Sequence, residues 1–339
     1  MKQPIRIQAE DRRQRLLALL ADGKFQSGEA LAQHLSISRG GVWKLVRSLR
    51  ALGIEVESLP RQGYRLPQSV DLLSRTAVLA SVGDDIRPLV ESLEVLLSVD
   101  STNLYLAHLQ DVAVGRMQVC LAEMQHAGRG RRGRSWIAPF GGGLCISFSW
   151  RFLEAPPAFS ALGLAVATAV VAALRRCGAA DVGVKWPNDL LWHNRKLAGI
   201  LIEMRGESAG PAHVVIGVGI NVSMPASARA AVAAAQGLGI SDLSEVLERR
   251  TPIRNHLAGA LIEEMIRMLH VFSNNGFAPF VEQWRALDVL ADSKVKVTSA
   301  TETVFGTARG VESDGTLLVE VDGRTRRFSS GDVSLRSGE

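Results

Sequence analysis

The run Gly128–Arg134 (GRGRRGR) constrains the fold of this chain more than any other segment. It matches the pattern G-x-G-x-x-G, which binds a dinucleotide only where a strand precedes it and a helix begins on it. A strand is predicted before the run, over Val119–Ala122. The residues that follow, Ser135–Gly143 (SWIAPFGGG), exclude a helix, and Leu144–Trp150 has the composition of a buried strand. The run is therefore a loop between two strands and not the turn of a Rossmann fold.

The charge of this loop narrows the choice of ligand. Four arginines alternate with three glycines, so cations and backbone amides converge on one short segment. Polyphosphates are the leading ligands for such a segment, either in a nucleic acid or in an activated phosphate ester over which the loop closes. A disordered RNA-binding tract is disfavoured, because the run is a single short copy between strand-forming segments. No P-loop pattern G-x-x-x-x-G-K-[ST] occurs in the chain, so a phosphate would be held by other means.

Composition places the chain among soluble globular proteins of two or three domains. It has 339 residues, of which 47% are hydrophobic and 22% charged. The three cysteines are too widely spaced to suggest a disulfide framework, and neither they nor the scattered histidines have the spacing of metal ligands. The polar N-terminus predicts no secretory signal. The apolar stretch Ala158–Leu174 is short for a membrane span and is predicted to be a buried helix, so we expect a cytoplasmic protein without membrane contact.

The basic excess of the chain is confined to its first fifth. Residues 1–66 hold 12 Lys and Arg against 6 Asp and Glu, whereas the whole chain holds 39 against 34. Residues 67–339 therefore hold 27 against 28 and are close to neutral. A basic module joined to a neutral body is the charge distribution expected of a protein with a nucleic-acid-binding domain.

The N-terminal residues have the order of elements of a winged helix-turn-helix domain. Three helices and a hairpin are predicted, over residues 12–21, 28–35, 38–52 and 54–66. Ser27 and Ser38 are suitable N-caps for the second and third helices. The hairpin would be the wing.

The third helix and the wing carry the residues expected to contact DNA. In a helix-turn-helix domain the recognition helix lies in the major groove, while other basic residues contact phosphates. The predicted DNA-binding residues are Ser38, Arg39, Trp43, Lys44, Arg47, Arg61 and Arg65. The alternative is a small helical bundle that contacts another protein, with its charges merely solvated. The charge and the order of elements together favour DNA.

The body of the chain combines buried strands with glycines at alternate positions. Lys196–Leu201 and Val214–Val222 are predicted strands, the first with Gly199 and the second with Gly217 and Gly219. Without side chains at these positions, the sheet surface has room for a flat ligand. Polar residues at the ends of the predicted strands surround that surface: Ser101, Thr102, Asn103, Lys185, Asn188, Asp189, Lys196 and Asn221. Together these features predict a binding site on the sheet.

The C-terminal part changes from helices to short strands. Amphipathic helices are predicted over His256–Phe272 and Phe277–Leu287. Four strands are predicted after them, over residues 294–298, 303–308, 316–321 and 325–328. Asp314-Gly315 and Asp322-Gly323 are typical hairpin turns between such strands. The pattern predicts a small barrel of SH3-like size.

These motifs, in this order, resemble those of biotin protein ligases. The resemblance rests on Ser101–Asn103, Gly128–Trp136, Lys185–Leu190, Lys196–Leu201 and Gly217–Asn221. The winged helix before them is similar to that of the bifunctional branch, the biotin operon repressors, so the resemblance spans nearly the whole chain. It implies an α+β multidomain fold: a winged helix-turn-helix, a central mixed β-sheet with helices similar to class II aminoacyl-tRNA synthetases, and a C-terminal SH3-like β-barrel. The implied domains are residues 1–67, 68–288 and 289–339.

The resemblance implies both an enzyme and a repressor. Biotin and ATP, with Mg²⁺, would give biotinyl-5′-AMP and pyrophosphate. A lysine of the biotin carboxyl carrier protein of acetyl-CoA carboxylase would then take the biotin and release AMP. As a homodimer formed on adenylate binding, the protein would also bind operator DNA and repress biotin synthesis. No fixed metal site is implied beyond the Mg²⁺ that accompanies ATP.

The family's site residues are carried over position by position. Lys196 and Arg131 are the implied catalytic residues, and Lys196 would hold the biotin carboxylate and the α-phosphate. The implied biotin-binding residues are Ser101, Thr102, Asn103, Gln125, Arg129, Gly130, Arg131 and Lys196. The implied ATP and adenylate contacts are Arg131, Arg132, Arg134, Trp136, Lys185, Asn188, Asp189 and Asn221. The loop that contains Arg131 is expected to order over the adenylate and exclude water.

The sequence departs from the family at two places, and two alternatives use the same residues. His126 stands where a second glutamine is expected. Residues 223–240 hold no tryptophan, although the family can cover adenine with one there, and Gly237–Gly239 takes that place. One alternative is a ligand-sensing transcription factor without catalysis. The other is a lipoate ligase on a similar fold, against which the Arg/Gly loop and the winged helix argue.

Overall fold

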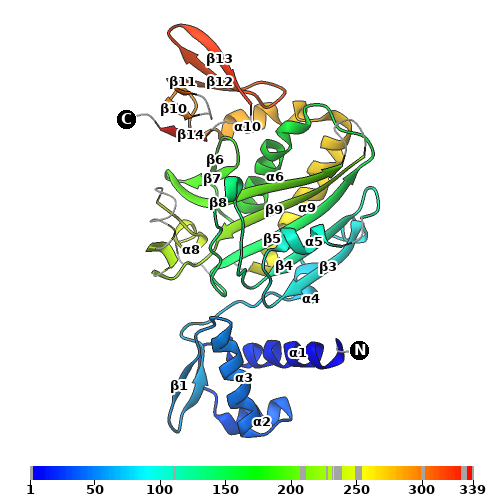
Figure 1. Cartoon of the computed structure of the whole chain (residues 1–339), viewed down its shortest axis with the longest axis vertical. Coiled ribbons are helices and arrows are strands. Elements are labelled where there is room, and N and C mark those ends of the chain that lie inside the picture. The colour runs from blue at the N-terminus through cyan, green and yellow to red at the C-terminus, as the bar shows by residue number, and fades with distance from the viewer. Residues whose placement is uncertain are drawn as a thin grey trace. The chain divides into compact units, whose positions relative to one another are not determined.

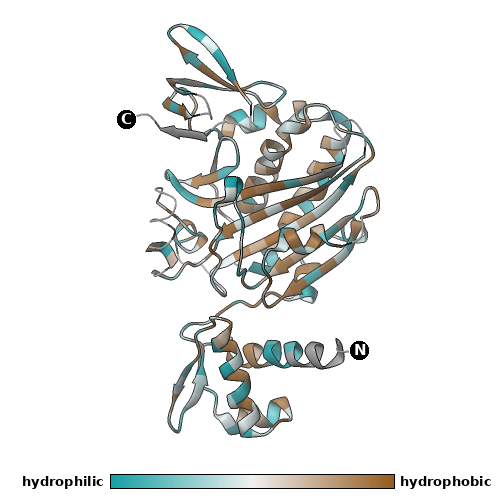
Figure 2. Ribbon diagram, in the orientation of Figure 1, coloured by the Kyte–Doolittle hydropathy of each residue, from teal (hydrophilic) through white to brown (hydrophobic). Residues whose placement is uncertain are grey.

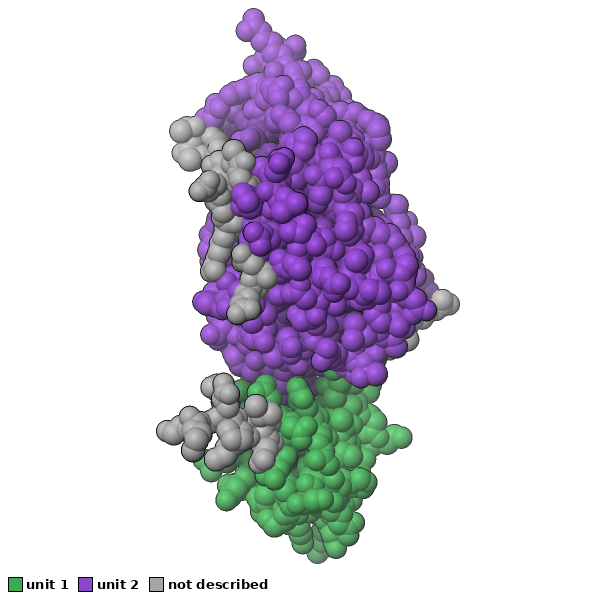
Figure 3. Space-filling view, turned by 90° about the vertical axis from the view of Figure 1, so that its right-hand side faces the viewer, with its two compact units in different colours: residues 1–73 green, residues 74–339 purple. Residues whose placement is uncertain are grey.

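The structure is a computed structural model in which two compact units are present. It describes residues 3–109, 112–206, 211–226, 228–230, 232, 239–248, 254–298, 302–329 and 334–337. The units are residues 1–73 and 74–339 (Figures 1 and 3). The predicted α+β organisation is confirmed, since a helix-turn-helix precedes a mixed sheet and a C-terminal antiparallel sheet. The boundaries predicted at residues 67 and 288 stay predictions.

The first unit has the three helices and the hairpin that the sequence predicts. Its elements are α1 (Gln3–Leu20), α2 (Gly28–Leu35), α3 (Arg39–Ala51), β1 (Glu57–Leu59) and β2 (Gly63–Arg65). Leu16 and Leu20 of α1 and Val46 and Leu49 of α3 are buried. Strand β1 is shorter than predicted, because the residues before it, Ile54 to Val56, bury their apolar side chains without joining the hairpin ladder.

Two serines begin the helices of the helix-turn-helix as predicted. Ser27 Oγ accepts a hydrogen bond from Ala30 N at 3.1 Å, and Ser38 Oγ accepts one from Gly41 N at the same distance. Each bond satisfies a backbone donor that the first turn of a helix leaves without a partner. The start of the recognition helix α3 is therefore fixed by its own sequence.

The second unit is built on a seven-stranded mixed sheet. The strand order is β3-β4-β5-β9-β8-β7-β6, in which only β3 and β4 are parallel (Figure 1). The strands are β3 (Val90–Leu96), β4 (Met117–Ala122), β5 (Gly143–Phe152), β6 (Gly183–Lys185), β7 (Asp189–Trp192), β8 (Arg195–Gly206) and β9 (Ala212–Asn221). Strand β3 begins at Val90, whereas the apolar pattern of the sequence predicts a strand only over Val95–Val99. It is an edge strand, and its exposed face admits polar residues that hide it from a hydropathy pattern.

Helices cover both faces of this sheet. The α-helices of the unit whose bounds the structure describes are α4 (Arg75–Ala80), α5 (Thr102–Ala107), α6 (Leu162–Arg176), α8 (Leu243–Val246), α9 (Arg254–Asn275) and α10 (Val281–Leu287). Helices α6 and α9 pack together on one face and α5 lies on the other (Figure 1). Alternate strand residues point to opposite faces, so Gly217 meets α5 while Ile202 meets α6. The α5 face carries the candidate site.

The apolar segment that raised the question of a membrane is a core helix. Among the described residues, Phe159–Arg176 is long and apolar enough to cross a membrane by length and composition alone. Helix α6 lies within it, is buried along most of its length and packs against α9. The predicted buried helix is confirmed, and the strands around it are correspondingly apolar (Figure 2).

The C-terminal part is a five-stranded antiparallel sheet of SH3-like type. Its order is β13-β12-β11-β10-β14. The strands are β10 (Lys294–Thr298), β11 (Thr303–Val311), β12 (Leu317–Val321), β13 (Arg324–Phe328) and β14 (Ser334–Ser337). Gly315 and Gly323 have φ of +81° and +73°, which confirms both predicted turns. Strand β14 was not predicted.

The link between α10 and β10 contains a buried carboxylate, that of Asp288. Asp288 Oδ1 accepts a hydrogen bond from Leu290 N at 3.0 Å, whereas Oδ2 is buried with no partner among the described residues. Burial, and to a lesser extent the charge of Asp292, raises the pKa of Asp288 to about 6, although the bond from Leu290 opposes this. The pKa of this carboxyl group is higher in the folded protein than its ordinary value of 3.8. It therefore lowers the free energy of unfolding as the pH rises from about 4 to about 6.

We expect Asp288→Asn to raise the free energy of unfolding by about 1–2 kcal/mol at pH 7.5, since the amide keeps the bond to Leu290 without a charge. The gain should shrink between pH 6 and pH 4, where the carboxyl group of the folded protein becomes protonated. Urea unfolding at several pH values measures it.

Asp314→Asn is the matched control. Burial raises the pKa of Asp314, but hydrogen bonds from Thr316 and the charge of Arg327 outweigh it and hold the pKa below its usual value. This substitution should therefore lower stability at pH 7.5. A gain for Asp288→Asn that does not change with pH would contradict the assignment.

Candidate active site

A pocket on the α5 face of the sheet gathers most of the predicted site residues. It lies over β8 and β9, between the start of α5 and the Arg/Gly loop. The predicted residues that line it are Ser101, Thr102, Asn103, Gln125, Arg129, Gly130, Arg131, Arg134, Trp136, Asn188, Asp189 and Lys196. Every residue predicted to bind biotin is among them. Segments as distant as residues 101 and 219 therefore meet in one site.

The inner end of the pocket is a set of neutral hydroxyl and amide groups, held by hydrogen bonds that include one to the carboxylate of Glu203. Gln125 Oε1 accepts hydrogen bonds from Thr102 N at 2.8 Å and from Thr102 Oγ1 at 3.1 Å. Ser147 Oγ lies 2.6 Å from both Thr102 Oγ1 and Asn103 Oδ1. Asn103 Nδ2 donates to Glu203 Oε2 at 2.9 Å. These contacts fix the orientation of each amide and hydroxyl, so the pocket presents a defined pattern of donors and acceptors.

The glycines of the sheet are required by the side chains that lie on them. A Cβ added at Gly217 would lie 2.3 Å from Asn103 Oδ1, and one added at Gly219 would lie 2.4 Å from the Trp136 ring. A Cβ at Gly199 would meet the same indole at 3.3 Å. We expected this surface to be clear for a flat ligand; in this structure it carries the flat ring of Trp136 instead. Burial raises the pKa of Cys145, which lines the pocket beside this ring, to about 12, so its thiol is uncharged.

The Arg/Gly loop folds back on itself above the pocket. Gly130 N donates to Arg134 O at 2.7 Å, and Trp136 N donates to Gly128 O at 2.8 Å. The short 3₁₀ turn η2 (Arg131–Gly133) contains Arg132 at φ +57°, a left-handed conformation that costs a non-glycine residue about 1 kcal/mol or more. The loop thus turns Arg129 and Arg131 toward the pocket and exposes Arg132.

Three cations of the pocket, Arg129, Arg131 and Lys196, have polar partners in the structure. Lys196 Nζ lies 2.7 Å from Asp189 Oδ1, and Arg129 Nη2 lies 2.8 Å from Glu203 Oε1. Arg131 Nη1 donates to Asn188 Oδ1 at 3.3 Å. Burial, with a smaller contribution from neighbouring positive charge, lowers the pKa of Arg131.

These partners have a consequence for binding. A positive field at short range favours an anionic ligand, and an anion that enters replaces carboxylate or amide partners that already hold the cations in place.

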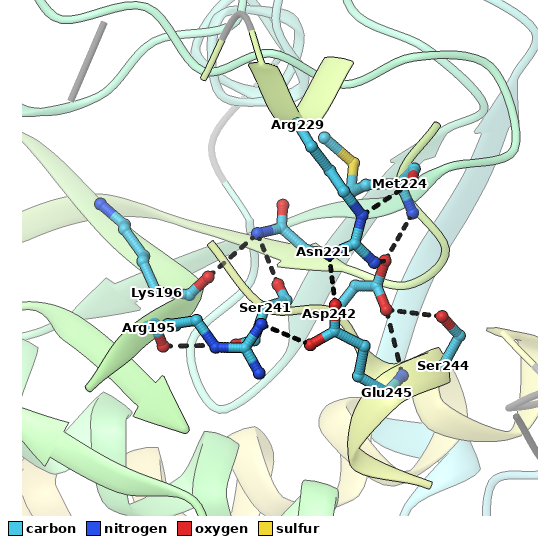
Figure 4. Close-up of polar contacts among 9 residues, drawn as sticks. All are labelled: Arg195, Lys196, Asn221, Met224, Arg229, Ser241, Asp242, Ser244 and Glu245. Atoms are coloured by element: carbon cyan, nitrogen blue, oxygen red, sulfur yellow. Dashed lines mark hydrogen bonds and ion pairs between the residues drawn. The ribbon is translucent and has the colours of Figure 1, made fainter. Parts of the chain in front are cut away.

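Three predicted nucleotide contacts lie outside the lining of this pocket. Arg132 is exposed, and Lys185 is buried in β6. Asn221 donates through Nδ2 to Lys196 O at 3.2 Å and to Ser241 O at 3.1 Å, so its amide holds backbone (Figure 4). Their contacts with ATP stay predictions. Of the glycines expected in place of a tryptophan, Gly237 lies outside the described residues, as does Leu238, and Gly239 is described.

Sequence reasoning missed two residues that organise the pocket. Glu203 joins Asn103 to Arg129, and Ser147 joins Thr102 to Asn103. Both carry a signal in the sequence, because each is a polar residue between two apolar neighbours of a strand. Glu203 also follows Gly199 at an even spacing, which places both on one face of β8.

The predicted DNA-binding residues fall into two groups. Arg39, Trp43, Lys44 and Arg47 are exposed on α3, where the Arg47 guanidinium lies 5.6 Å from the Trp43 ring. Arg61 is exposed at the tip of the wing, in the turn closed by a bond from Gln62 N to Leu59 O. The other two are engaged within the unit, since Ser38 caps α3 and Arg65 pairs with Glu57 at 2.6 Å.

Three protein families match consecutive parts of the chain. They are the HTH domain over residues 12–65, the biotin/lipoate A/B protein ligase family over residues 95–221, and the biotin protein ligase C terminal domain over residues 292–336. Their order is the order of the structural parts described above.

Known proteins and structures give a similar result. The chain is 39% identical over 329 residues to the bifunctional ligase/repressor BirA of Escherichia coli strain K12, which covers 96% of this chain and 97% of that protein. It is 29% identical to the protein of the same name from Bacillus subtilis strain 168, and that match covers 93% of this chain and 95% of the relative. The biotin protein ligase from Aquifex aeolicus in complex with biotin and ATP superposes with a TM-score of 0.62 at 25% identity, covering 73% of this chain and all of that one. By these matches the chain belongs to the biotin protein ligase family, in the branch that carries an N-terminal helix-turn-helix domain.

Proposed function

We propose that the pocket binds biotin and ATP, joins them as biotinyl-5′-AMP and passes the biotin to a lysine of the biotin carboxyl carrier protein. One observation carries this proposal: all eight residues expected to contact biotin line a single pocket, beside the cations expected to contact phosphate. The bifunctional relative supports it, because that protein is named both a ligase and a repressor.

The neutral end of the pocket suits the ureido head of biotin. A ureido group has two N–H donors and one carbonyl acceptor and carries no charge. Thr102, Asn103 and Gln125 offer hydroxyl and amide groups that other side chains already hold in position. Side chains that hydrogen bonds already hold in the binding orientation lose little conformational entropy when the ligand binds.

The charged end suits the joining of two anions. A carboxylate oxygen of biotin attacks the α-phosphorus of ATP, and the bond to pyrophosphate breaks, so negative charge develops on the phosphoryl oxygens. Lys196 and Arg131 are the cations nearest to Asn188 and Asp189 on the pocket wall. Cations held beside developing charge stabilise the transition state, since they need no reorganisation during the reaction.

The second step needs a dry site. The amine of a lysine on the carrier protein attacks the carbonyl carbon of the adenylate, and AMP leaves with the former bond electrons. Water would compete for the same mixed anhydride. Trp136 and the Arg/Gly loop lie over the sheet where the adenylate would be held, and both would restrict the entry of water.

Mg²⁺ would enter with ATP. Asp189 and Asn188 place a carboxylate and an amide oxygen on the pocket wall, and oxygen donors of this kind together with phosphates suit this ion. Mg²⁺ would neutralise phosphate charge when bound.

The N-terminal unit would make the same protein a regulator. We infer that α3 and the wing bind operator DNA, that a homodimer forms on adenylate binding, and that the protein acts in the cytoplasm. The exposed cations on α3 and at Arg61 support the DNA contact, and a dimer would match a palindromic site.

Exchange of labelled pyrophosphate into ATP tests the proposed activity. We expect exchange with biotin and none with lipoate as the acid. Lys196→Ala should slow it by about 10²- to 10³-fold, because one cation at the developing charge is lost. Lys294→Ala, which removes an exposed lysine of β10, should leave the rate unchanged. A wild-type protein without exchange would be a ligand-sensing transcription factor, and exchange with lipoate would indicate a lipoate ligase.

Two substitutions of Glu203 separate its contacts. Glu203→Gln keeps an oxygen for Asn103 Nδ2 but loses the charge opposite Arg129, whereas Glu203→Ala loses both. We expect the alanine variant to raise the KM for biotin about tenfold and the glutamine variant to raise it only slightly, because one lost hydrogen bond to a charged group is worth about 1.5 kcal/mol. Equal effects would show that the charge, and not the position of Asn103, matters for biotin.

Arg61→Gly tests the wing. Arg61 has φ of +66° at the third residue of a tight turn, a conformation that favours glycine, so the substitution should leave the unit as stable or raise its stability by about 1 kcal/mol. Operator affinity in a gel shift should fall, and the slope of log affinity against log salt should decrease by about 1 as a phosphate contact disappears. Asp322→Gly relieves a similar conformation in the C-terminal sheet and should not affect DNA. Unchanged affinity for Arg61→Gly would remove the wing from the interface.

A further inference from the structure

A chain of four charged side chains lies beside the pocket, at the start of β8 (Figure 4). Asp242 pairs with Arg229, Arg229 pairs with Glu245, and Glu245 Oε2 lies 2.7 Å from Arg195 Nη1. None of the four is among the residues predicted for the site. We call them the Asp242 network.

The carboxylate of Asp242 is the centre of this network. Its side chain is fully buried, and it accepts from Met224 N at 2.7 Å, Ser244 Oγ at 2.6 Å and Glu245 N at 3.2 Å, in addition to Arg229. A buried carboxylate is tolerated only when such donors surround it. Asp242 therefore connects two separate segments of the chain. One contains Met224 and Arg229, and the other is the first turn of α8.

The residue next to Asp242 holds the backbone of Lys196. Ser241 N donates to Lys196 O at 3.0 Å, and Lys196 N donates to Gly239 O at 2.9 Å. The same Lys196 carbonyl accepts from Asn221 Nδ2, which also bonds Ser241 O. Both backbone polar groups of Lys196 are thus bound to the segment that Asp242 anchors.

The side chain of Lys196 points the other way. In Figure 4 it extends away from the network, and its Nζ meets Asp189 in the pocket. Arg195, the preceding residue, points into the network and pairs with Glu245. Successive residues of β8 therefore connect the network to the pocket, because side chains alternate along a strand.

We propose that Asp242, together with Arg229 and Glu245, is a positioning group for Lys196. The network fixes residues 239–241, these residues fix the backbone of Lys196, and the lysine side chain then starts from one defined position beside the phosphate site. This inference rests on the proposed role of Lys196 in adenylation. Displacement of a reacting group by about 1 Å costs roughly 10²-fold in rate, so loss of the network acts on the rate before it acts on the fold.

The test uses Asp242→Asn and Glu245→Gln in the full-length protein. Both keep the shape of the side chain and remove its charge; Glu245 is more exposed, so its variant folds even where the buried substitution does not. Arg176→Gln is the matched control, since it breaks an ion pair to another buried carboxylate, Glu263, between α6 and α9. The measurements are biotin-dependent pyrophosphate exchange, biotin affinity, and amide hydrogen exchange at Lys196 and Ser241.

We expect both network variants to slow pyrophosphate exchange by about tenfold or more, with biotin affinity almost unchanged. Amide exchange at Lys196 and Ser241 should become faster. In a Lys196→Ala background the same substitutions should cause no further loss of rate, because a residue that acts through Lys196 has nothing left to position. Arg176→Gln should lower stability and leave all three measurements as in the wild type.

Two results would overturn the inference: unchanged amide protection at Lys196 in both variants, or equal loss of rate with and without the lysine side chain. The amide measurement does not depend on activity. If the wild-type protein lacks pyrophosphate exchange while the two variants lose amide protection at Lys196, the proposed function is contradicted. The connection between the Asp242 network and Lys196 then still stands.

Discussion

The antiparallel pairing of β5, β9 and β8 is the constraint on which the rest of the site depends. It places Gly217 and Gly219 on β9 opposite the pocket side chains, at distances where a Cβ would overlap Asn103 and Trp136. The floor of the pocket is therefore backbone, and the polar side chains beside it are brought there by α5 and by the Arg/Gly loop. A register shift of one residue would turn these glycines to the α6 face and destroy the site.

The electrostatics of the pocket follow from partners on the same strands. Asp189 and Glu203 hold Lys196 and Arg129 through ion pairs, of which the Lys196–Asp189 pair is largely sheltered from solvent. The cations are thereby aimed before a substrate arrives, which is the condition for effective stabilisation of developing charge. The Asp242 network adds a second constraint on the position of Lys196, because it holds the segment that is hydrogen-bonded to the Lys196 backbone.

Motifs at strand ends were predictable, and their supporting contacts were not. The hydroxyl and amide residues at the start of α5 and the Arg/Gly loop follow recognisable patterns, and the structure brings them together. Ser147 and Glu203 carry only a weak signal, because each is a polar residue between two apolar neighbours of a strand. Asp242 and Arg229 carry none, since their partners lie on other segments and the pairing depends on how the chain folds. Lys185 and Asn221 show the converse, because a polar residue at a strand end can face the interior of the protein.

The sequence by itself determined the elements and their order. Apolar spacing, serine caps and glycine turns are local properties, so the winged helix, the core helix α6 and the C-terminal strands β10 to β13 can be read from it. Only the tertiary structure decided which polar groups meet: that Trp136 lies on the glycines of β8 and β9, that Glu203 joins Asn103 to Arg129, and that Asp242 anchors the segment bound to Lys196. The physical reason is that a hydrogen bond or ion pair between distant segments depends on distances of a few ångströms, which sheet pairing and helix packing fix and local sequence does not.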